Sequence, residues 1–293
     1  MPDFPNEIEN HMDLLSDPTL LRQHCQKWRS KGLTIALVPT MGFLHAGHLS
    51  LLDHARTRAD KLVLSIFVNP TQFGPNEDLD RYPRDLPHDL ELARAHGVDL
   101  AFTPEPQAMY QPDHATWVDV PELGQGLCGA SRPGHFRGVC TVVTKLFGLV
   151  RPDVAVFGEK DWQQLAILRR MTRDLDLGVD IVGRPIFREA DGLALSSRNV
   201  YLTPEERASA PAIRQGLLLV QSAVQAGERD AARLGLMFRA HLAEKLTGAS
   251  VDYADFVHPE AMSPVACVEA PTLFAVAVFL SRVRLIDNIL LEV

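Results

Sequence analysis

Two histidines and two glycines in one short stretch form the strongest candidate for chemistry in this sequence. His45 and His48 lie three residues apart, and Gly42 and Gly47 lie on either side of His45. Side chains at this spacing share one side of a helical turn. A glycine-containing turn at the start of a helix offers unpaired backbone N–H groups and a positive dipole end, which favour phosphate. The stretch therefore predicts a phosphate site with two imidazoles beside it.

The neighbouring sequence predicts the elements that position this turn. Residues 33–38 form an apolar run, rich in β-branched side chains, with the length of one buried strand. From Gly47 onward the apolar residues recur at helical spacing, which predicts a strand, a turn and a helix in succession. The same joint often serves only packing in α/β proteins, and the sequence lacks both the G-x-G-x-x-G fingerprint and the P-loop. A metal site is a weaker interpretation, because the turn contains no third histidine or cysteine.

Length and composition indicate a folded enzyme-sized protein. The chain has 293 residues, 46% of them hydrophobic and 23% charged, which suits one large domain or two moderate ones. Its net charge of −8 argues against a general nucleic-acid partner. The four cysteines are scattered, as is typical of thiols in a reducing compartment. The first residues lack an apolar signal region, and the most apolar stretch, 273–280, is too short to span a membrane. We therefore expect a cytoplasmic protein without a membrane partner.

Alternating strands and helices predict the fold class. Further buried strands are expected over 62–68, 98–102 and 154–157, with helices between them, and a short strand over 116–120. Strands separated by helices favour a parallel sheet with helices on both faces. The expected α/β architecture is therefore a Rossmann-like parallel sheet flanked by helices over residues 1–186.

The remainder of the chain changes character. Helices expected over 204–226 and 229–246 precede three strand-like runs near 251–258, 273–280 and 283–291. Helices followed by clustered strands are typical of an α+β unit. We therefore predict a smaller C-terminal α+β domain over 187–293, with a small antiparallel sheet.

Polar residues gather where several of these apolar segments end. Asn69 and Gln72 follow the second strand, Lys160 and Asp161 follow the fourth, and the segment 196–199 contains two serines and an arginine. Open α/β sheets place ligands at strand ends, and hydroxyls with an arginine suit phosphate oxygens. An Asn-Pro turn and a solvated pair at a helix start are the alternative, purely structural interpretations of the first two groups.

Short motifs follow one another in a fixed order along nearly the whole chain. They are VPTMG at 38–42, HAGH at 45–48, SIFVNPTQF at 65–73, FGEKD at 157–161, LSSRN at 195–199 and RLIDN at 284–288. HAGH resembles the HxGH signature of the nucleotidyltransferase superfamily, and the whole set resembles the pantothenate synthetases, the pantoate–β-alanine ligase family. SIFVNPTQF is the most specific match, because other nucleotidyltransferases lack it. The sequence departs from the usual pattern at Trp162, where the family usually has Tyr, and at Leu195, where it often has Met.

The resemblance implies a reaction and its participants. It implies the ATP-dependent condensation of (R)-pantoate with β-alanine to pantothenate, AMP and diphosphate, through a pantoyl-adenylate intermediate. ATP is then the co-substrate, Mg²⁺ accompanies it, and the protein is a homodimer formed through its first domain. The second domain is expected to act as a lid that keeps water from the adenylate.

The resemblance also implies roles for individual residues. His45, His48, Lys160 and Arg198 are the expected catalytic residues, with His48 as the proton donor. Gln72 and Gln164 are expected to bind pantoate, with Gln72 also near β-alanine. No protein ligand is assigned to the metal, although Asp89 is a possible outer ligand of Mg²⁺. The expected ATP-binding residues are Met41, Gly42, Phe43, Leu44, His45, Ala46, Gly47, His48, Gly158, Glu159, Lys160, Asp161, Phe187, Leu195, Ser196, Ser197 and Arg198.

Three other functions are compatible with parts of this pattern. Another HxGH enzyme would transfer AMP to a nucleotide monophosphate and would not need the 65–73 segment. A class I aminoacyl-tRNA synthetase would need a tRNA-binding domain and a basic surface, against which the net charge of −8 argues. A regulator that binds nucleotide without catalysis would be expected to lose His48, Lys160 or Arg198, and all three are present.

Overall fold

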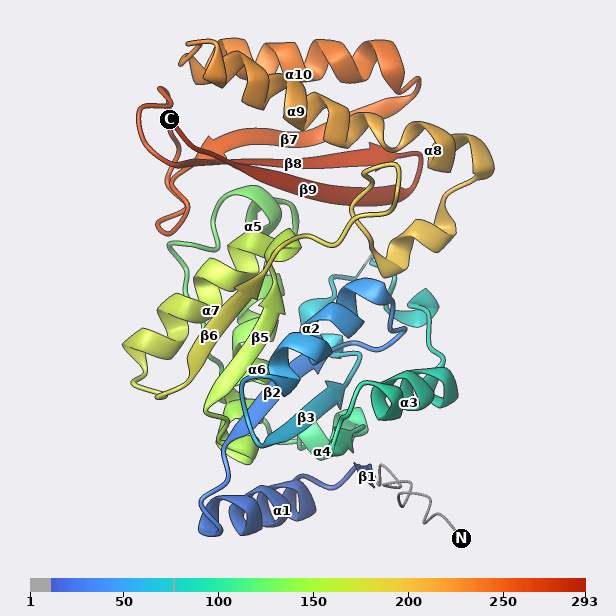
Figure 1. Cartoon of the computed structure of the whole chain (residues 1–293), viewed down its shortest axis with the longest axis vertical. Coiled ribbons are helices and arrows are strands. Elements are labelled where there is room, and N and C mark those ends of the chain that lie inside the picture. Colours follow the sequence, from blue (N-terminus) through green and yellow to red (C-terminus); the bar gives the residue numbers. More distant parts are fainter. Residues whose placement is uncertain (1–11, 76) are drawn as a thin grey trace, which may run out of the picture.

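The computed structural model describes residues 12–75 and 77–293 (Figure 1). Residues 1–11 and 76, which belong to the predicted first domain, lie outside the described residues. The described chain forms a six-stranded parallel sheet and a three-stranded antiparallel sheet. None of the described helices is long and apolar enough to cross a membrane.

The parallel sheet forms the lower part of the molecule in Figure 1, and its strand order is β1-β4-β3-β2-β5-β6. All of its pairings are parallel, so the carboxyl ends of β2, β3 and β5 meet at one edge. The strands are β1 (Asp13–Leu15), β2 (Ile35–Thr40), β3 (Lys61–Ile66), β4 (Leu100–Phe102), β5 (Val154–Gly158) and β6 (Asp180–Arg184).

Helices cover both faces of this sheet. Successive side chains of a strand point to opposite faces, so Leu37 and Val63 join one core cluster while Val38 and Leu64 join another. The first cluster includes the apolar residues of α1 (Pro18–Ser30), α6 (His135–Val150) and α7 (Trp162–Asp174). The second includes those of α2 (Ala46–Arg56) and α3 (Leu86–Ala95). Two short helices, α4 (Pro106–Met109) and α5 (Leu127–Ser131), lie in the connection between β4 and α6.

The antiparallel sheet forms the upper part of the molecule, with α9 (Ala212–Gln225) and α10 (Ala231–Lys245) above it (Figure 1). Its strands are β7 (Ala249–Val257), β8 (Thr272–Leu280) and β9 (Val283–Leu291), with β8 in the middle. Phe274 and Val276 of β8 pack in the cluster formed by α9 and α10. Leu273 and Ala275 instead join the cluster of α6 and α7. The two sheets therefore share one core cluster, which fixes how the C-terminal part lies over the first.

The predicted fold class is confirmed, and most predicted strands are present within a few residues. The predicted strand at 116–120 is wrong: the Val118 N–H donates to the Thr141 hydroxyl at 3.1 Å instead of to a neighbouring strand. The helix predicted over 204–226 is divided at Pro211 into α8 (Pro204–Ser209) and α9, because proline has no N–H for a helical hydrogen bond. Two edge strands, β1 and β6, were not predicted. The boundary between residues 186 and 187 stays a prediction.

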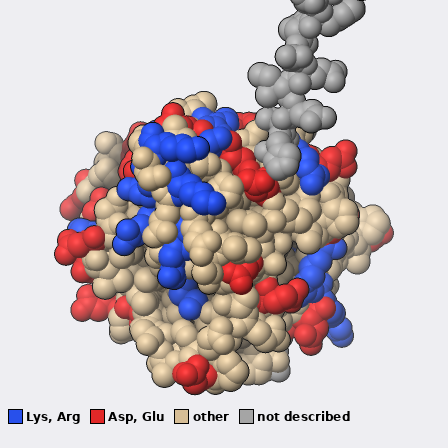
Figure 2. Space-filling view, turned by 90° about the horizontal axis from the view of Figure 1, so that it is seen from below, with Lys and Arg blue, Asp and Glu red and all other residues tan. Residues whose placement is uncertain are grey.

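One face of the surface is seen from below in Figure 2. Basic side chains form a short band there, with acidic side chains beside it and a wide uncharged area around both (Figure 2). Nucleic-acid-binding surfaces carry an extended basic stripe or patch. The expectation that the protein has no nucleic-acid partner stays a prediction, with which this face agrees.

The backbone of α6 lies unusually close to the turn that follows β3. A Cβ atom on Gly138 would lie 2.4 Å from the carbonyl oxygen of Thr71 and 2.8 Å from the Cα of Gln72. Only glycine lets the two backbones come this close. The turn η1 (Pro70–Gln72) is therefore placed directly against α6.

We predict that Gly138→Ala lowers the free energy of unfolding by ~1–3 kcal/mol, as overpacking of a core typically does. Gly148→Ala is the matched control in the same helix, because nothing lies within 4 Å of its Cβ position. There the better helix propensity of alanine adds ~0.5–1 kcal/mol. Urea unfolding of both variants measures the difference, and equal stabilities for the two would contradict the close approach.

Candidate active site

Two adjoining cavities lie between the carboxyl edge of the parallel sheet and the C-terminal sheet. The first, of about 240 Å³, is formed by the ends of β2, β3 and β5 together with α6. The second, of about 640 Å³, extends beneath β7–β9. Lys160, Asp161, Gln164, Ser196 and Arg198 line both, so the two cavities form one continuous site.

Most of the predicted site residues are brought together here, although their sequence positions span more than half the chain. Gly42, Phe43, Leu44, Ala46 and Glu159 are absent from the lining of either cavity. The predicted residues that line the first cavity are Met41, His45, Gly47, His48, Gln72, Gly158, Lys160, Asp161, Gln164, Phe187, Leu195, Ser196, Ser197 and Arg198.

The turn after β2 is held by a buried carboxylate. Asp89, 1% exposed, accepts hydrogen bonds from the Phe43 N–H at 2.8 Å and the Leu44 N–H at 2.6 Å. Gly42 and Phe43 adopt φ values of +80° and +52°, and a Cβ on Gly42 would lie 2.9 Å from Asp89 Oδ2. Burial raises the pKa of Asp89, and its two N–H partners oppose that shift. Asp89 therefore shapes the turn, and the possible role as an outer Mg²⁺ ligand is not supported by its position.

The bonds to Asp89 change the expected role of Phe43 and Leu44 in ATP binding. The N–H groups of Phe43 and Leu44 are already used by Asp89, and Leu44 is itself buried. The N–H groups left for an anion are those of Ala46 and Gly47 in the first turn of α2, because the His45 side chain caps the His48 N–H and the other first-turn donors have no partner within the helix. The predicted phosphate site of this element is therefore limited to the start of α2, and it stays a prediction.

The two histidines stack on each other at the start of α2. His45 is the N-cap residue and His48 lies three positions on, with ring centroids 4.0 Å apart and an interplanar angle of 26°. His48 Nδ1 accepts the His45 backbone N–H at 3.3 Å. A neutral imidazole that accepts at one nitrogen carries its proton on the other. The His48 ring therefore presents Nε2–H as a donor.

Both rings are neutral at pH 7 in the ligand-free protein. Each keeps some surface toward the cavity, but the surrounding protein atoms desolvate it. Desolvation first, and then the charge of Lys160, lowers the pKa of His45 to about 4. Desolvation first, then His45 and Lys160, lowers the pKa of His48 to about 3. The pair therefore acts through hydrogen bonds, and not as standing positive charges.

The amide of Gln72 is fixed by the residues around it. Asn69 Oδ1 accepts from the Thr71 hydroxyl and the Tyr110 phenol, both at 2.9 Å. Asn69 Nδ2 must therefore face Gln72, and it donates to Gln72 Oε1 at 3.1 Å. Gln72 Nε2 lies 3.1 Å from Met41 Sδ, at the cavity wall. Gln72 therefore offers a donor to a ligand, which suits an oxygen of a carboxylate or a hydroxyl.

The cations of the site differ in how they are paired. The Lys160 ammonium has no hydrogen bond or ion pair among the described residues. Arg198 donates two hydrogen bonds to Asp78, at 2.9 and 2.8 Å, and Arg132 donates to Glu77 at 2.8 Å. Arg198 was predicted, whereas its partner Asp78 was not. No local pattern in the sequence indicates a pairing across 120 positions.

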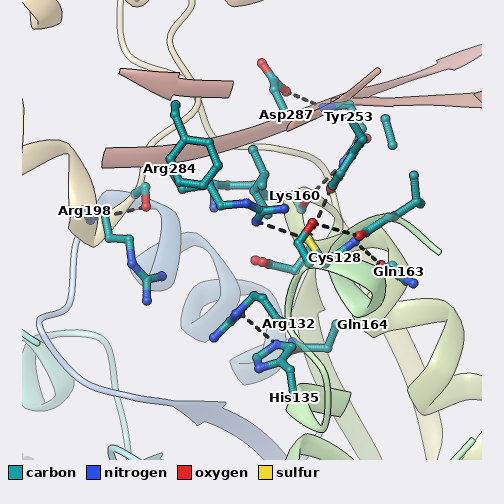
Figure 3. Close-up of a pocket in the computed structure, with 18 of the residues that line it drawn as sticks. Cys128, Arg132, His135, Lys160, Gln163, Gln164, Arg198, Tyr253, Arg284 and Asp287 are labelled. Carbon is teal, nitrogen blue, oxygen red and sulfur yellow. Dashed lines mark hydrogen bonds between the residues drawn. The ribbon is translucent and has the colours of Figure 1, made fainter. Parts of the chain in front are cut away.

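Of the neighbouring glutamines after β5, only one faces the cavity freely. Gln163 accepts the Cys128 N–H at 3.0 Å and donates to the Leu123 carbonyl at 2.8 Å, so it is a structural residue. Gln164 lines both cavities and lies with Arg132, His135 and Lys160 around the site in Figure 3. The sequence indicated no role for His135, yet its Nδ1 donates to the Gln72 carbonyl at 2.8 Å.

The comparisons with known proteins agree with this geometry. The family model "Pantoate-beta-alanine ligase" matches residues 13–290. The chain belongs to this family. Curated relatives named pantothenate synthetase include that of Nitratidesulfovibrio vulgaris, 58% identical over 96% of this chain and 99% of the relative. That of Solidesulfovibrio magneticus is 59% identical over 94% of this chain and 97% of the relative.

Solved structures of the family have the same fold. Pantothenate synthetase from Thermus thermophilus is 44% identical, covers 96% of this chain and 100% of its own, and has a TM-score of 0.89. The pantoate-β-alanine ligase from Francisella tularensis is 30% identical, with 97% and 99% coverage and a TM-score of 0.79. Its title describes a complex with "Beta-gamma ATP" and β-alanine. The family assignment is therefore confirmed, while the roles of individual residues stay predictions.

The departure from the family pattern at Trp162 has a structural consequence here. Its indole Nε1 donates to the carbonyl oxygen of Pro259 at 2.8 Å, which joins the start of α7 to the C-terminal part of the chain. The other departure, Leu195, lies in the wall of the first cavity. The change at Trp162 replaces the phenol hydroxyl of tyrosine by an indole N–H, which can only donate.

His135 predicts a specific pH dependence of stability. Its Nε2 lies 3.1 Å from Arg132, and burial and that charge lower its pKa to about 4, against 6.5 when exposed. His135 therefore binds a proton below pH 6.5 in the unfolded chain but only below about pH 4 in the folded chain. Lowering the pH from 7 to 5 costs about 2 kcal/mol of stability through this residue alone.

We predict that His135→Gln loses less stability than the parent between these pH values, by about that amount. Denaturant unfolding at pH 7 and pH 5 measures it. His88→Gln, at an exposed position of α3, is the control and is expected to keep the parental dependence. An unchanged pH dependence in His135→Gln would contradict the neutral, buried state of His135.

Proposed function

We propose how this site carries out the reaction of its family. The chain is a ligase that forms an amide bond, joining pantoate to β-alanine with ATP as co-substrate. One observation carries the assignment of residues: the histidine pair, an unpaired lysine and two glutamine amides converge on one continuous cavity. These groups match the needs of a carboxylate that must be activated by ATP.

In the first step the carboxylate of (R)-pantoate attacks the α-phosphorus of ATP and diphosphate leaves. A carboxylate does not react with an amine until one of its oxygens becomes part of a good leaving group, and adenylation provides this. The attack brings two anions together, so fixed donors and cations must offset their charge. We assign this role to His45, His48, Lys160 and Arg198, with the first-turn N–H groups of α2.

His48 enters this step as a neutral hydrogen-bond donor. Its Nε2–H is directed away from the helix backbone, because Nδ1 is occupied by the His45 N–H. A phosphate oxygen beside the ring favours the charged form and raises the pKa of His48 from about 3. The His48 ring therefore gains positive charge as negative charge develops on the phosphate. This is the behaviour that a proton donor needs, and His48 is the expected proton donor.

In the second step the amine of β-alanine attacks the carbonyl carbon of the adenylate. The new C–N bond forms, the C–O bond to AMP breaks, and the amine loses a proton. Gln72 and Gln164 hold pantoate through their amides, with the donor face of Gln72 toward the substrate. Phe67, Val142 and Val143, which line the same cavity, suit the apolar carbon chain of pantoate.

The nucleotide occupies the remaining wall of the site in this proposal. Asp161 offers a carboxylate to the ribose hydroxyls, while Met41, Phe187 and Leu195 border the nucleotide. Ser196 and Ser197 lie beside Arg198 and face the phosphates. Ala46 contributes its backbone N–H at the start of α2, whereas Gly42, Phe43, Leu44 and Glu159, which do not line either cavity, position the residues next to them.

We also propose that Mg²⁺ accompanies ATP. The described residues contain no group of three side chains of metal-binding type. Mg²⁺ usually keeps several waters and binds substrate phosphates with few protein ligands, so this site fits a phosphate-bound ion. When bound, the ion neutralises phosphate charge.

Three further properties are proposals on the same basis. The C-terminal domain over 187–293 acts as a lid over the adenylate, and β7–β9 already form the roof of the larger cavity. The protein forms a homodimer through its first domain, where a second copy would cover Trp117, 39% exposed. The protein resides in the cytoplasm, with which its four unpaired cysteines agree.

Isotope exchange between diphosphate and ATP tests the proposed reaction directly. We predict exchange that requires (R)-pantoate and proceeds without β-alanine, because the adenylate forms reversibly. A nucleotide monophosphate in place of pantoate separates this function from the AMP-transferring alternative. Exchange with the monophosphate alone would overturn the ligase assignment.

His48→Gln tests the residue assignment in the same assay. We expect the exchange rate to fall by about 10²-fold or more, as loss of a positioned donor typically causes, with pantoate affinity little changed. His54→Gln, at the other end of α2 and outside both cavity linings, is the matched control. Equal exchange rates in the two variants would remove His48 from the mechanism.

A further inference from the structure

Asn288 of β9 reaches from the C-terminal sheet to the loop that carries Lys160. Its Nδ2 donates to the carbonyl oxygens of Glu159 at 2.9 Å and of Lys160 at 3.0 Å. These carbonyls belong to the turn η3 (Glu159–Asp161), which follows directly on β5. Asn288 is 6% exposed, so each of these bonds is made in a nearly dry setting where an unpaired polar group is costly.

Asp287, the preceding residue, holds a second loop of the site. Its carboxylate, 4% exposed on the side chain, accepts two hydrogen bonds from Arg188, at 2.7 and 2.8 Å. Arg188 also donates to the Gly192 carbonyl at 3.1 Å and forms a β-bridge with Ala194. These contacts close the segment 187–195, termed here the strap, whose ends Phe187 and Leu195 line the first cavity.

The two neighbours can serve different loops because they lie on opposite faces of one strand. Ile286, which like Asn288 occupies an even position of β9, packs toward the core shared by the two sheets. Leu285 and Ile289, which share the face of Asp287, pack in the other core cluster. Two consecutive residues of β9 therefore hold two different segments: Asn288 holds the loop that carries Lys160, and Asp287 holds the strap. Figure 3 shows Asp287 at the top of the site and Lys160 beneath it, near the middle.

We propose that Asp287 and Asn288 are positioning residues for ATP, which hold the Lys160 loop and the strap at a fixed separation. Neither residue is assigned a contact with substrate. The inference rests on the proposed nucleotide site, since it assumes that ATP lies between these two loops. In this proposal the C-terminal sheet does more than cover the site as a lid, because it also positions the residues that bind the nucleotide.

The alternative is that this pair merely ties the two parts of the chain together. The protein offers a control for that, because the Ser131 hydroxyl donates to Asp252 of β7 at 2.8 Å and so joins the same two parts at another point. This bond touches neither the Lys160 loop nor the strap. Ser131 lines the larger cavity, as Asn288 does. Loss of either tie weakens the contact between the sheets, but only loss of Asn288 releases the loop that carries Lys160.

The test compares Asn288→Ala with Ser131→Ala by calorimetry, using a non-hydrolysable ATP analogue and, separately, (R)-pantoate. For Asn288→Ala we expect the dissociation constant of the nucleotide to rise at least fivefold and that of pantoate to change less than twofold. For Ser131→Ala we expect both to change less than twofold. Thermal unfolding of each variant confirms that the folded protein is being compared.

Three results would overturn the inference. They are unchanged nucleotide binding in Asn288→Ala, an equal loss for both ligands, or the same nucleotide loss in Ser131→Ala. Should Asn288→Ala fail to fold, Arg188→Lys applies the same test from the strap, because lysine keeps the charge and loses the paired bonds to Asp287. Binding of the ATP analogue is measured without pantoate, so the result does not depend on which carboxylate the enzyme adenylates. A failure here is therefore distinct from a failure of the pantoate-dependent exchange.

Discussion

The hydrogen bonds from the Phe43 and Leu44 N–H groups to the buried carboxylate of Asp89 determine the geometry of the site. They hold Phe43 in a left-handed conformation that a residue with a side chain does not adopt without compensation, next to Gly42, which adopts a positive φ freely. The turn in that shape places His45 at the N-cap of α2, where the two imidazoles stack. A buried acid outside the cavity thus sets the position of the groups inside it.

The electrostatics of the ligand-free site follow from the same burial. Both histidines are neutral, and two of the arginines around the cavity are paired with Asp78 and Glu77 of one loop. Lys160 alone has a free charge among the cations discussed for the described site. In the proposed function, a triphosphate therefore meets hydrogen-bond donors and one cation first, and it competes with Asp78 for Arg198. The site is arranged to develop positive character as the anion binds.

Much of this could be predicted from the sequence. Central strands such as β2 and β3 are apolar on both faces, so their composition identifies them, and the glycines with His45 and His48 mark the turn. The edge strands could not be predicted in the same way. β6 is partly exposed along its length, and β1 has only three residues. The extended segment at 116–120 has a strand-like composition, but its backbone contacts a side chain of α6 instead.

The site was predictable in its residue types and not in its pairings. Motifs identify Lys160 and Arg198, but only the folded chain shows that one is free and the other is held by Asp78. Asp89 was considered from the sequence only as a possible outer ligand of Mg²⁺, and the fold uses both of its oxygens for the turn. Long-range polar contacts of this kind depend on packing that local sequence does not encode. The RLIDN segment shows the same limit, since its contacts to two loops appear only in the fold.

His48 is a neutral donor with its proton on Nε2 before ATP binds, and the proposed first step depends on this state. Nitrogen-15 spectra of histidine-labelled protein, with the His48 signals assigned from their loss in His48→Gln, test it most directly. We predict a protonated Nε2 and an unprotonated Nδ1 at pH 7, with no proton uptake down to about pH 5. A charged ring at pH 7, or a neutral ring protonated on Nδ1, would contradict it.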